Sequence, residues 1–399
     1  MKRFNGKVKE IIKSWGPAWL VMIADVDAAS AITAVNTGAQ YGTKLVWFLI
    51  LLVVPLYVIQ EVAGRVGVVT GKGLGELIRI NFSRKIAVFS AIPMALVDVL
   101  SYIVEYTGIA VGFQMMGVSP WISVPIAFLA HLLVVYNRKY AEAEKPLLVV
   151  SLIFSVVWIV AAFLRARGGI EVTPFYFSSS PDFIFLLAAN IGAVIMPFML
   201  FYQVSATVEK GTDKNNIWAI RFETLIGAIF SELIMVAIAV SAIGIDVGSL
   251  DFASPKLLSQ SLTSVAGHFA PYVFGIGLIT ASFIALIVIS LGSCWGVTEA
   301  LGWGRKHWFK VYLIESLPAV VIPLFSLNLI KLALNLMVLQ IVVLIAPAVI
   351  LGVIAGNKKL MGDYRLRGFN QFIYWFFIIV IFATGVVSIL PSLGIKLQP

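Results

Sequence analysis

Long apolar segments alternate with short polar segments along nearly the whole chain. A helix needs about 20 apolar residues to cross the hydrocarbon core of a bilayer. By that measure, the pattern predicts eleven membrane-spanning helices and therefore an all-α membrane protein. Their approximate ranges are 16–40, 45–66, 86–114, 119–136, 146–165, 182–205, 217–243, 271–301, 311–327, 329–355 and 370–391.

The first predicted span is interrupted near its middle. The stretch from Ala24 to Ser30 reads ADVDAAS, in which two carboxylates, Asp25 and Asp27, are followed by small residues. A carboxylate at mid-membrane depth costs at least a few kcal/mol, so such residues usually serve a function. We expect the helix to unwind here, where the small residues let the backbone approach a substrate.

A second interruption lies in the sixth predicted span. The stretch from Gly192 to Pro197 reads GAVIMP, and proline removes a backbone donor and clashes with the preceding helical turn. Each interruption falls in the first of five consecutive spans, and the two groups of five enter the membrane from opposite sides. Broken spans in corresponding positions of two halves point to the substrate site of a transporter. The pattern therefore predicts two inverted five-helix repeats with an eleventh helix.

Lysine and arginine gather in the N-terminal segment and in every second loop, which sets the predicted orientation because positively charged loops stay in the cytoplasm. The predicted organisation is a basic cytoplasmic leader (1–14), a first inverted repeat (15–165), an extracellular loop (166–181), a second inverted repeat (182–355), and a loop with the eleventh helix and an external C-terminus (356–399). The basic residues expected on the outer side are Lys44, Arg165, Arg167, Lys256, Lys331 and Lys396.

Composition agrees with a multi-pass protein of the cell (plasma) membrane. The 399 residues are 60% hydrophobic and only 12% charged, whereas a soluble domain carries about 25% charged residues. The net charge of +9 lies in loops that set topology, so we expect the lipid bilayer, and no nucleic acid, as a partner. The single cysteine, Cys294, excludes a disulfide framework and a Cys-rich metal site. The sequence contains no catalytic motif, so we expect a non-enzymatic, monomeric protein without a cofactor.

Two side chains at the interruptions are candidate ligands for a cation. Asp27 and unwound carbonyls would offer hard oxygen ligands, and Asp27 would also cap the half-helix that follows. Met196, just before Pro197, offers a soft thioether that suits transition metals, although a lone methionine in a span usually only packs. The backbone carbonyls of Ala24 and Ala193 could complete the coordination.

The third span carries a polar row. Asp98, Ser101, Tyr102 and Glu105 are spaced to share one helix face. Such a row could relay protons or shape a water path, and it could equally serve hydrogen bonds between helices.

Other intramembrane polar residues favour structural roles. Asp25 could line a vestibule or pair with a basic residue, and His131 is expected to be a hydrogen-bonded core residue. Structural ion pairs with Lys or Arg are predicted for Glu232, Glu299 and Glu315.

Five motifs in order resemble the Nramp family of divalent-metal transporters over about the first ten helices. They are Gly16-Pro17-Ala18 ahead of Asp27, Gly67-Val68-Val69-Thr70-Gly71-Lys72, Glu105-Tyr106-Thr107-Gly108, Gly192-Ala193-Val194-Ile195-Met196-Pro197 and Val297-Thr298-Glu299. This resemblance implies a LeuT-type fold, with two inverted five-helix repeats, discontinuous helices 1 and 6, and an eleventh helix.

The resemblance also implies roles for single residues. Asp27 and Met196 match the family's side-chain metal ligands, Ala24 and Ala193 match its carbonyl ligands, and Glu105 matches a glutamate near its proton route. The first-helix motif is divergent, since Ser30 stands where the family has a ligand asparagine. Gln340 lies one residue from the position expected for a tenth-helix ligand glutamine, which falls on Ile341.

These matches imply a secondary transporter that imports Mn²⁺ or Fe²⁺ by alternating access. Proton coupling is expected to be weak or lost, because Phe198 and Tyr102 stand where the family has a histidine and an aspartate. One alternative is a LeuT-fold carrier for Mg²⁺ or a small organic solute, although the related Mg²⁺-transporting branch lacks the methionine. Another alternative is a membrane metal sensor that does not transport.

Overall fold

The computed structural model describes residues 16–137, 140–171, 173, 175–245, 259–325 and 328–390. Within these residues all regular secondary structure is helical. The predicted leader, Lys256, Lys396 and most of the predicted external C-terminus lie outside the described residues.

Each predicted span coincides with one helix or with a pair of helices. In chain order these are α2 (Pro17–Asp25) with α3 (Ala28–Tyr41), α4 (Val46–Thr70), α6 (Arg84–Gln114), α7 (Pro120–Asn137), α8 (Tyr140–Arg167), α9 (Pro181–Val194) with α10 (Pro197–Lys210), α11 (Ile217–Ser241), α14 (Ala270–Leu301), α15 (Trp308–Val321), α16 (Leu329–Gly356) and α18 (Gly368–Ile389). Seven stretches of the described chain are long and apolar enough to cross a membrane, judged by length and composition. The remaining helices do not meet this criterion within the described residues, so the number of crossings stays a prediction.

Three short helices in the connections were not predicted from the sequence. They are α5 (Leu74–Asn81), α13 (Thr263–Ala266) and α17 (Lys358–Met361). The ninth predicted span also ends early. Its helix stops at Val321 and continues as one 3₁₀ turn, Ile322–Leu324, in which Pro323 has no backbone N–H to donate.

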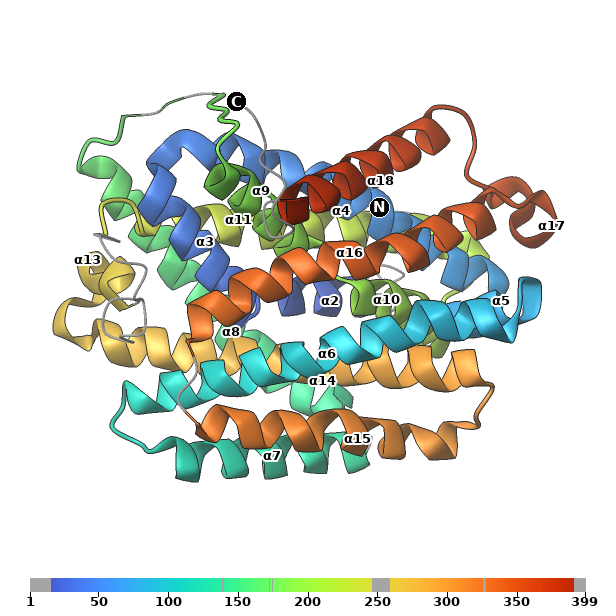
Figure 1. The fold of residues 1–399 in the computed structure, drawn as a ribbon, viewed down its shortest axis with the longest axis horizontal. Helices are drawn as coiled ribbons and strands as arrows, with labels where there is room; N and C mark the ends of the chain where they lie inside the picture. The colour runs from blue at the N-terminus through green and yellow to red at the C-terminus, as the bar shows by residue number, and fades with distance from the viewer. Residues whose placement is uncertain are drawn as a thin grey trace, which may run out of the picture.

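The helices run largely side by side along the long axis of the molecule (Figure 1). The long helix α6 packs along α14, and it also contacts α7, α15 and α16. The interrupted pairs lie among these helices: α2 contacts α11 and α14, α9 contacts α16, and α10 contacts α4 and α14. The two interruptions are therefore enclosed by helices.

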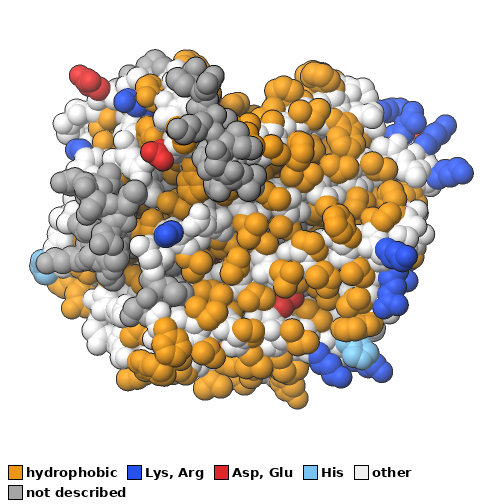
Figure 2. All heavy atoms as spheres, viewed as in Figure 1, with side chains coloured by type: hydrophobic (Ala, Val, Ile, Leu, Met, Phe, Trp, Pro, Cys, Tyr) orange, Lys and Arg blue, Asp and Glu red, His pale blue; other side chains and the backbone are white. Residues whose placement is uncertain are grey.

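The outside of the molecule is apolar between its two ends. Figure 2 shows hydrophobic side chains over most of the described face, and lysines and arginines gathered at the end where α5 and α17 lie. Large side chains such as Phe89, Ile314 and Phe369 are 70%, 71% and 74% exposed. An exposed apolar surface of this extent is that of a protein surrounded by lipid. The protein is a multi-pass membrane protein.

Candidate functional site

Both predicted interruptions are present as breaks of two residues. Val26 and Asp27 separate α2 from α3, and Ile195 and Met196 separate α9 from α10. Pro197 occupies the first position of α10, where its missing N–H has no intrahelical acceptor to lose. Each break exposes the carbonyl end of one half-helix and the amide end of the next.

Asp27 begins α3 as its N-cap. Its Oδ1 accepts a hydrogen bond of 2.7 Å from the backbone N–H of Ser30, and the residue is only 2% exposed. The capping role considered from the sequence is therefore real. The cap uses the Oδ1 of the carboxylate.

A hydrogen bond joins the two breaks. The Ser30 hydroxyl donates to the carbonyl oxygen of Ala193 at 2.9 Å. Two turns further along, Asn190 Nδ2 donates to the Thr37 hydroxyl at 2.8 Å, which ties α3 to α9 a second time. Ser30 and Ala193, two of the predicted ligands, are thus brought together, and in this conformation each is the other's partner.

Sulfur lies at the second break. Met196 is buried, and its backbone N–H donates to the sulfur of Met199 at 3.4 Å. Ala24 and Ala193 both lie in the last turn of a half-helix, where carbonyls lack intrahelical partners. Met199 was missed in the sequence, although its spacing of three from Met196 places it on the same side of a helix start.

Glu105 of α6 reaches the first break. Its Oε2 accepts from the backbone N–H of Ala28 at 3.2 Å, so Asp27 and Glu105 both face the first turn of α3. The amide end of a helix carries a partial positive charge that favours such anions. The close approach of α6 depends on Gly108, because a Cβ there would lie 2.8 Å from the Ala28 Cβ and 2.6 Å from the Ser282 hydroxyl.

The rest of the polar row on α6 is also buried. Gln340 of α16 donates from Nε2 to the Ser101 hydroxyl at 3.0 Å. Both Asp98 oxygens, the Tyr102 hydroxyl and the Gln340 Oε1 have no hydrogen-bond partner among the described residues. The structure therefore groups Gln340 with the α6 row, one helical turn from Glu105.

The secondary candidates divide into correct and wrong predictions. His131 is a hydrogen-bonded core residue as expected, with Nδ1 at 2.9 Å from the Tyr106 hydroxyl and Nε2 at 2.7 Å from that of Ser290. Asp25 accepts from the Ser231 hydroxyl at 2.9 Å.

The predicted ion pairs are wrong within the described residues. Glu299 and Glu315 accept from the hydroxyls of Ser205 and Ser293, both at 2.9 Å, and Glu232 has no hydrogen-bond partner there. Ion pairs do form elsewhere: Glu61 contacts the buried Arg65 at 2.7 Å and the partly exposed Arg221 at 2.8 Å.

The sequence model described as "Natural resistance-associated macrophage protein-like" (Nramp) matches residues 18–391. This chain belongs to the Nramp family. A relative named divalent metal cation transporter MntH, from Klebsiella pneumoniae subsp. pneumoniae, is 25% identical over 397 residues, which cover 95% of this chain and 94% of the relative. MntH of another Klebsiella pneumoniae strain is 25% identical over 367 residues, covering 87% and 86% of the two chains.

Solved structures show that this Nramp chain has the LeuT-type fold. The Eremococcus coleocola manganese transporter superposes with a TM-score of 0.77 at 17% identity, over 95% of this chain and 86% of that chain. Mhp1, a nucleobase-cation-symport-1 family transporter, superposes with a TM-score of 0.58 at 14% identity, over 95% and 91%. The predicted family and fold class are confirmed.

Two departures from the family pattern have structural consequences in this Nramp chain. Ser30 donates its hydroxyl hydrogen to the Ala193 carbonyl. Its side chain could therefore bind a cation only through an oxygen lone pair or after a rotation of the hydroxyl. Phe198 is fully buried in the first turn of α10, and it brings neither a charge nor a proton to the second break.

Proposed function

We propose that this chain is a secondary transporter that imports a divalent transition metal ion, Mn²⁺ or Fe²⁺, by alternating access. The proposal is supported by relatives that are named divalent metal cation transporters and by a similar fold in a manganese transporter. Its fold places two broken helices side by side in the protein interior, where LeuT-type transporters bind their substrates.

The observation that carries the proposal is the bond between Ser30 and Ala193. It joins the two breaks, one with the Asp27 carboxylate and one with the Met196 thioether. We assign the charge at the site to Asp27 and the sulfur to Met196. The carbonyls of Ala24 and Ala193 would supply further oxygens.

Two further ligands are proposed, and the side chain of each would have to move to reach the ion. The Ser30 hydroxyl would turn from the Ala193 carbonyl so that both oxygens could face the ion. The Gln340 amide oxygen is unpartnered, but its Nε2 is bonded to Ser101, so the side chain would have to reach past α6 to join the site.

The ligand set favours transition metals over Mg²⁺. Sulfur is a soft ligand that binds Mn²⁺, Fe²⁺ or Cd²⁺ better than it binds the hard ions Mg²⁺ and Ca²⁺. The part of the chain that the structure describes has no group of three His, Cys, Asp or Glu arranged for a metal. Selectivity would therefore depend on Met196.

Glu105, Asp98 and Tyr102 remain the proposed proton or water path. Glu105 contacts the break directly, while Tyr102 lies between Glu105 and Asp98 on α6 and offers a phenol hydroxyl in place of a carboxylate. We propose that this interruption makes coupling of metal entry to protons weak or absent.

We also propose how the protein lies in a plasma membrane. The basic end that carries α5 and α17 would face the cytoplasm (Figure 2), as positively charged loops do. The two inverted repeats would comprise residues 15–165 and 182–355, joined by an outer loop at 166–181, and the protein would act as a monomer.

Isothermal titration of the purified protein with Mn²⁺, Mg²⁺ and Ca²⁺, followed by flux of the bound ion into proteoliposomes, tests the function. We expect Mn²⁺ to bind more tightly than the other two ions and to cross the membrane. Binding without flux would favour a metal sensor. Preference for Mg²⁺, or no metal binding at all, would favour the LeuT-fold carrier for Mg²⁺ or an organic solute.

A further inference from the structure

The start of α2 is capped by a glutamate from another helix. No side chain of its own caps α2, and the Oε1 of Glu223 on α11 accepts from the backbone N–H groups of Gly16 and Trp19, both at 2.8 Å. The first N–H groups of a helix have no intrahelical acceptor, so Glu223 satisfies two of them at once. The Nζ of Lys210 also lies near the start of α2, 3.5 Å from the point that a Cβ on Gly16 would occupy.

The start of α5 is capped in the same way. Its N-cap residue, Gly73, has no side chain, and the Oε2 of Glu299 on α14 accepts from the backbone N–H of Gly75 at 3.1 Å. The other oxygen of Glu299 accepts from Ser205 of α10 at 2.9 Å. A Cβ on Gly73 would overlap the Glu299 carboxylate, so a glycine is needed here for the carboxylate of another helix to cap α5.

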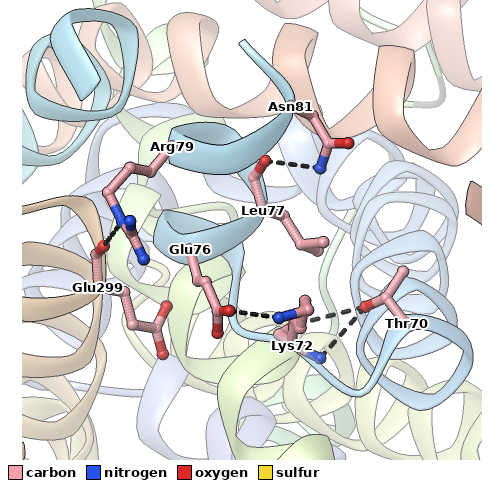
Figure 3. Close-up of polar contacts among 7 residues, drawn as sticks. All are labelled: Thr70, Lys72, Glu76, Leu77, Arg79, Asn81 and Glu299. Carbon is pink, nitrogen blue, oxygen red and sulfur yellow. Dashed lines mark hydrogen bonds and ion pairs between the residues drawn. The ribbon is translucent and has the colours of Figure 1, made fainter. Parts of the chain in front are cut away.

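Arg79 ties α5 to α14 a second time. Its Nε donates to the backbone carbonyl of Glu299 at 3.1 Å, while Lys72 and Glu76 pair with each other nearby (Figure 3). A cavity of about 320 Å³ lies against this contact, with Glu76, Arg79, Ser205 and Glu299 in its lining. Water in such a space could replace Glu299 as the partner of the α5 amide.

Both caps connect the two predicted repeats. The carboxylates come from α11 and α14 in the second, and the capped helices, α2 and α5, belong to the first. At 1.5 Å per residue, α2 is only about 13 Å long. Because Ala24 lies at the other end of this short helix, a movement of the capped end would also move the proposed metal site.

We infer that Glu223 and Glu299 are positioning residues of the transport cycle, which hold α2 and α5 in place and keep the proposed cytoplasmic side closed. This inference rests on the proposed function, because only a transporter must open that side to release an ion. In the closed conformation the carboxylates satisfy the helix amides. On opening, the amides pass to cytosolic water and the contacts between the repeats break.

A buried reporter on α2 tests the inference. Met22 is fully buried and faces Gly227 of α11, where a Cβ would lie 2.7 Å from the Met22 side chain. Met22→Cys in a Cys294→Ser background would be treated with a membrane-impermeant methanethiosulfonate in inside-out vesicles. Loss of a hydrogen bond to a charged group shifts an equilibrium by about tenfold, so Glu223→Ala and Glu299→Ala, which remove such bonds between helices, should each raise the labelling rate by about that factor.

The matched control is Glu76→Ala, which removes an acid from the first turn of α5 without removing a bond to another helix. It should leave the labelling rate unchanged. Unchanged rates in both Glu223→Ala and Glu299→Ala would overturn the inference. If Glu223→Ala does not reach the membrane, Glu223→Gln, which loses the charge but keeps an acceptor, should still raise the rate by a smaller factor; no rise would count against the inference.

A double variant separates a tie between helices from simple capping. Gly73 has φ −68° and ψ 159°, which suit an aspartate N-cap, so Gly73→Asp with Glu299→Ala restores the cap of α5 without the bond to α14. We expect labelling to stay as fast as in Glu299→Ala. A return to the parental rate would show that Glu299 only caps α5.

Labelling needs no metal, which separates this inference from the proposed function. Faster labelling in the variants of a protein that moves no Mn²⁺ would keep the positioning role and reject the proposed substrate. Normal Mn²⁺ flux in the parent, with labelling unchanged in the variants, would reject the positioning role alone.

Discussion

At the scale of single residues, the breaks are built from side chains with two tasks each. Asp27 caps α3 and, in the proposed function, supplies the charge for the ion. Ser30 closes the contact with α9 and would be a ligand after turning. Since capping and binding use different oxygens of one carboxylate, substitutions must be chosen so that they remove one task and preserve the other.

Asp27→Asn should abolish metal binding while the protein stays folded. Asparagine is as good an N-cap as aspartate, so α3 is kept, but the formal charge next to the ion is lost. We expect Mn²⁺ affinity to fall by at least about 100-fold, which exceeds the usual effect of groups outside the ligand shell. Titration calorimetry checks this, with Asp25→Asn as the control. Unchanged affinity in Asp27→Asn would place the ion elsewhere.

Met196→Ala should change selectivity more than it changes total affinity. We expect Mn²⁺ and Cd²⁺ to bind about tenfold more weakly, with little change for Mg²⁺ and Ca²⁺, because only softer metals gain from sulfur. Competition titrations against the four ions measure the difference, with Met199→Ala as the matched control. An equal loss for all four ions would mean that Met196 acts by packing.

At the scale of helices, the start of α3 is the meeting point. α2, α6 and α9 all deliver groups to it: the break residues, the Glu105 carboxylate and the Ala193 carbonyl. α6 then continues as a buried row through Tyr102 to Asp98. A rigid helix with one end at the substrate site could link that site to events further along, provided that every station on its face can pass a proton.

Metal flux is expected to acidify the vesicle lumen weakly or not at all. Phe198 cannot carry a proton, and Tyr102, which has a phenol hydroxyl in place of a carboxylate, separates Glu105 from Asp98 on α6. A pH-sensitive dye trapped inside proteoliposomes, with Mn²⁺ added on the outside, measures this directly. Robust acidification that disappears in Glu105→Gln would make α6 the proton path after all.

At the scale of the whole molecule, the two breaks, the apolar outer surface (the belt) and the basic end with α5 and α17 form one arrangement. The breaks are enclosed by helices, the belt faces lipid, and Lys and Arg gather at one end (Figure 2). The proposed cytoplasmic cap on α5 lies at that end (Figure 1). Transport by alternating access would then move the first-repeat elements against α11 and α14.

Reporter fusions test the proposed orientation. A fusion after the last residue should be external, and one within residues 358–367, which include α17, should be cytoplasmic, because the basic loops fix that side. Alkaline phosphatase and green fluorescent protein fusions give opposite signals on the two sides. Finding both fusions on one side of the membrane would remove the eleven-helix arrangement and the inverted repeats with it.

The sequence by itself determined the helices, the breaks and the family. Apolar length and the need to satisfy backbone groups within each segment make membrane helices a local property, so all the long ranges could be read from the pattern. The breaks were also local, since Pro197 and the residues around Asp27 cannot continue an apolar helix. The helices α5, α13 and α17 are too short to leave a comparable signal.

Only the tertiary structure decided which polar groups meet. Ser30 and Ala193 are 163 positions apart, Ala28 and Glu105 are 77 apart, and Gly75 and Glu299 are 224 apart. The ion pairs predicted for Glu299 and Glu315 are wrong for this reason. Packing brings hydroxyl and amide donors from other helices, and not a lysine or arginine, to these two carboxylates within the described residues. A buried carboxylate must find a partner, but the fold selects the partner that is close enough to donate.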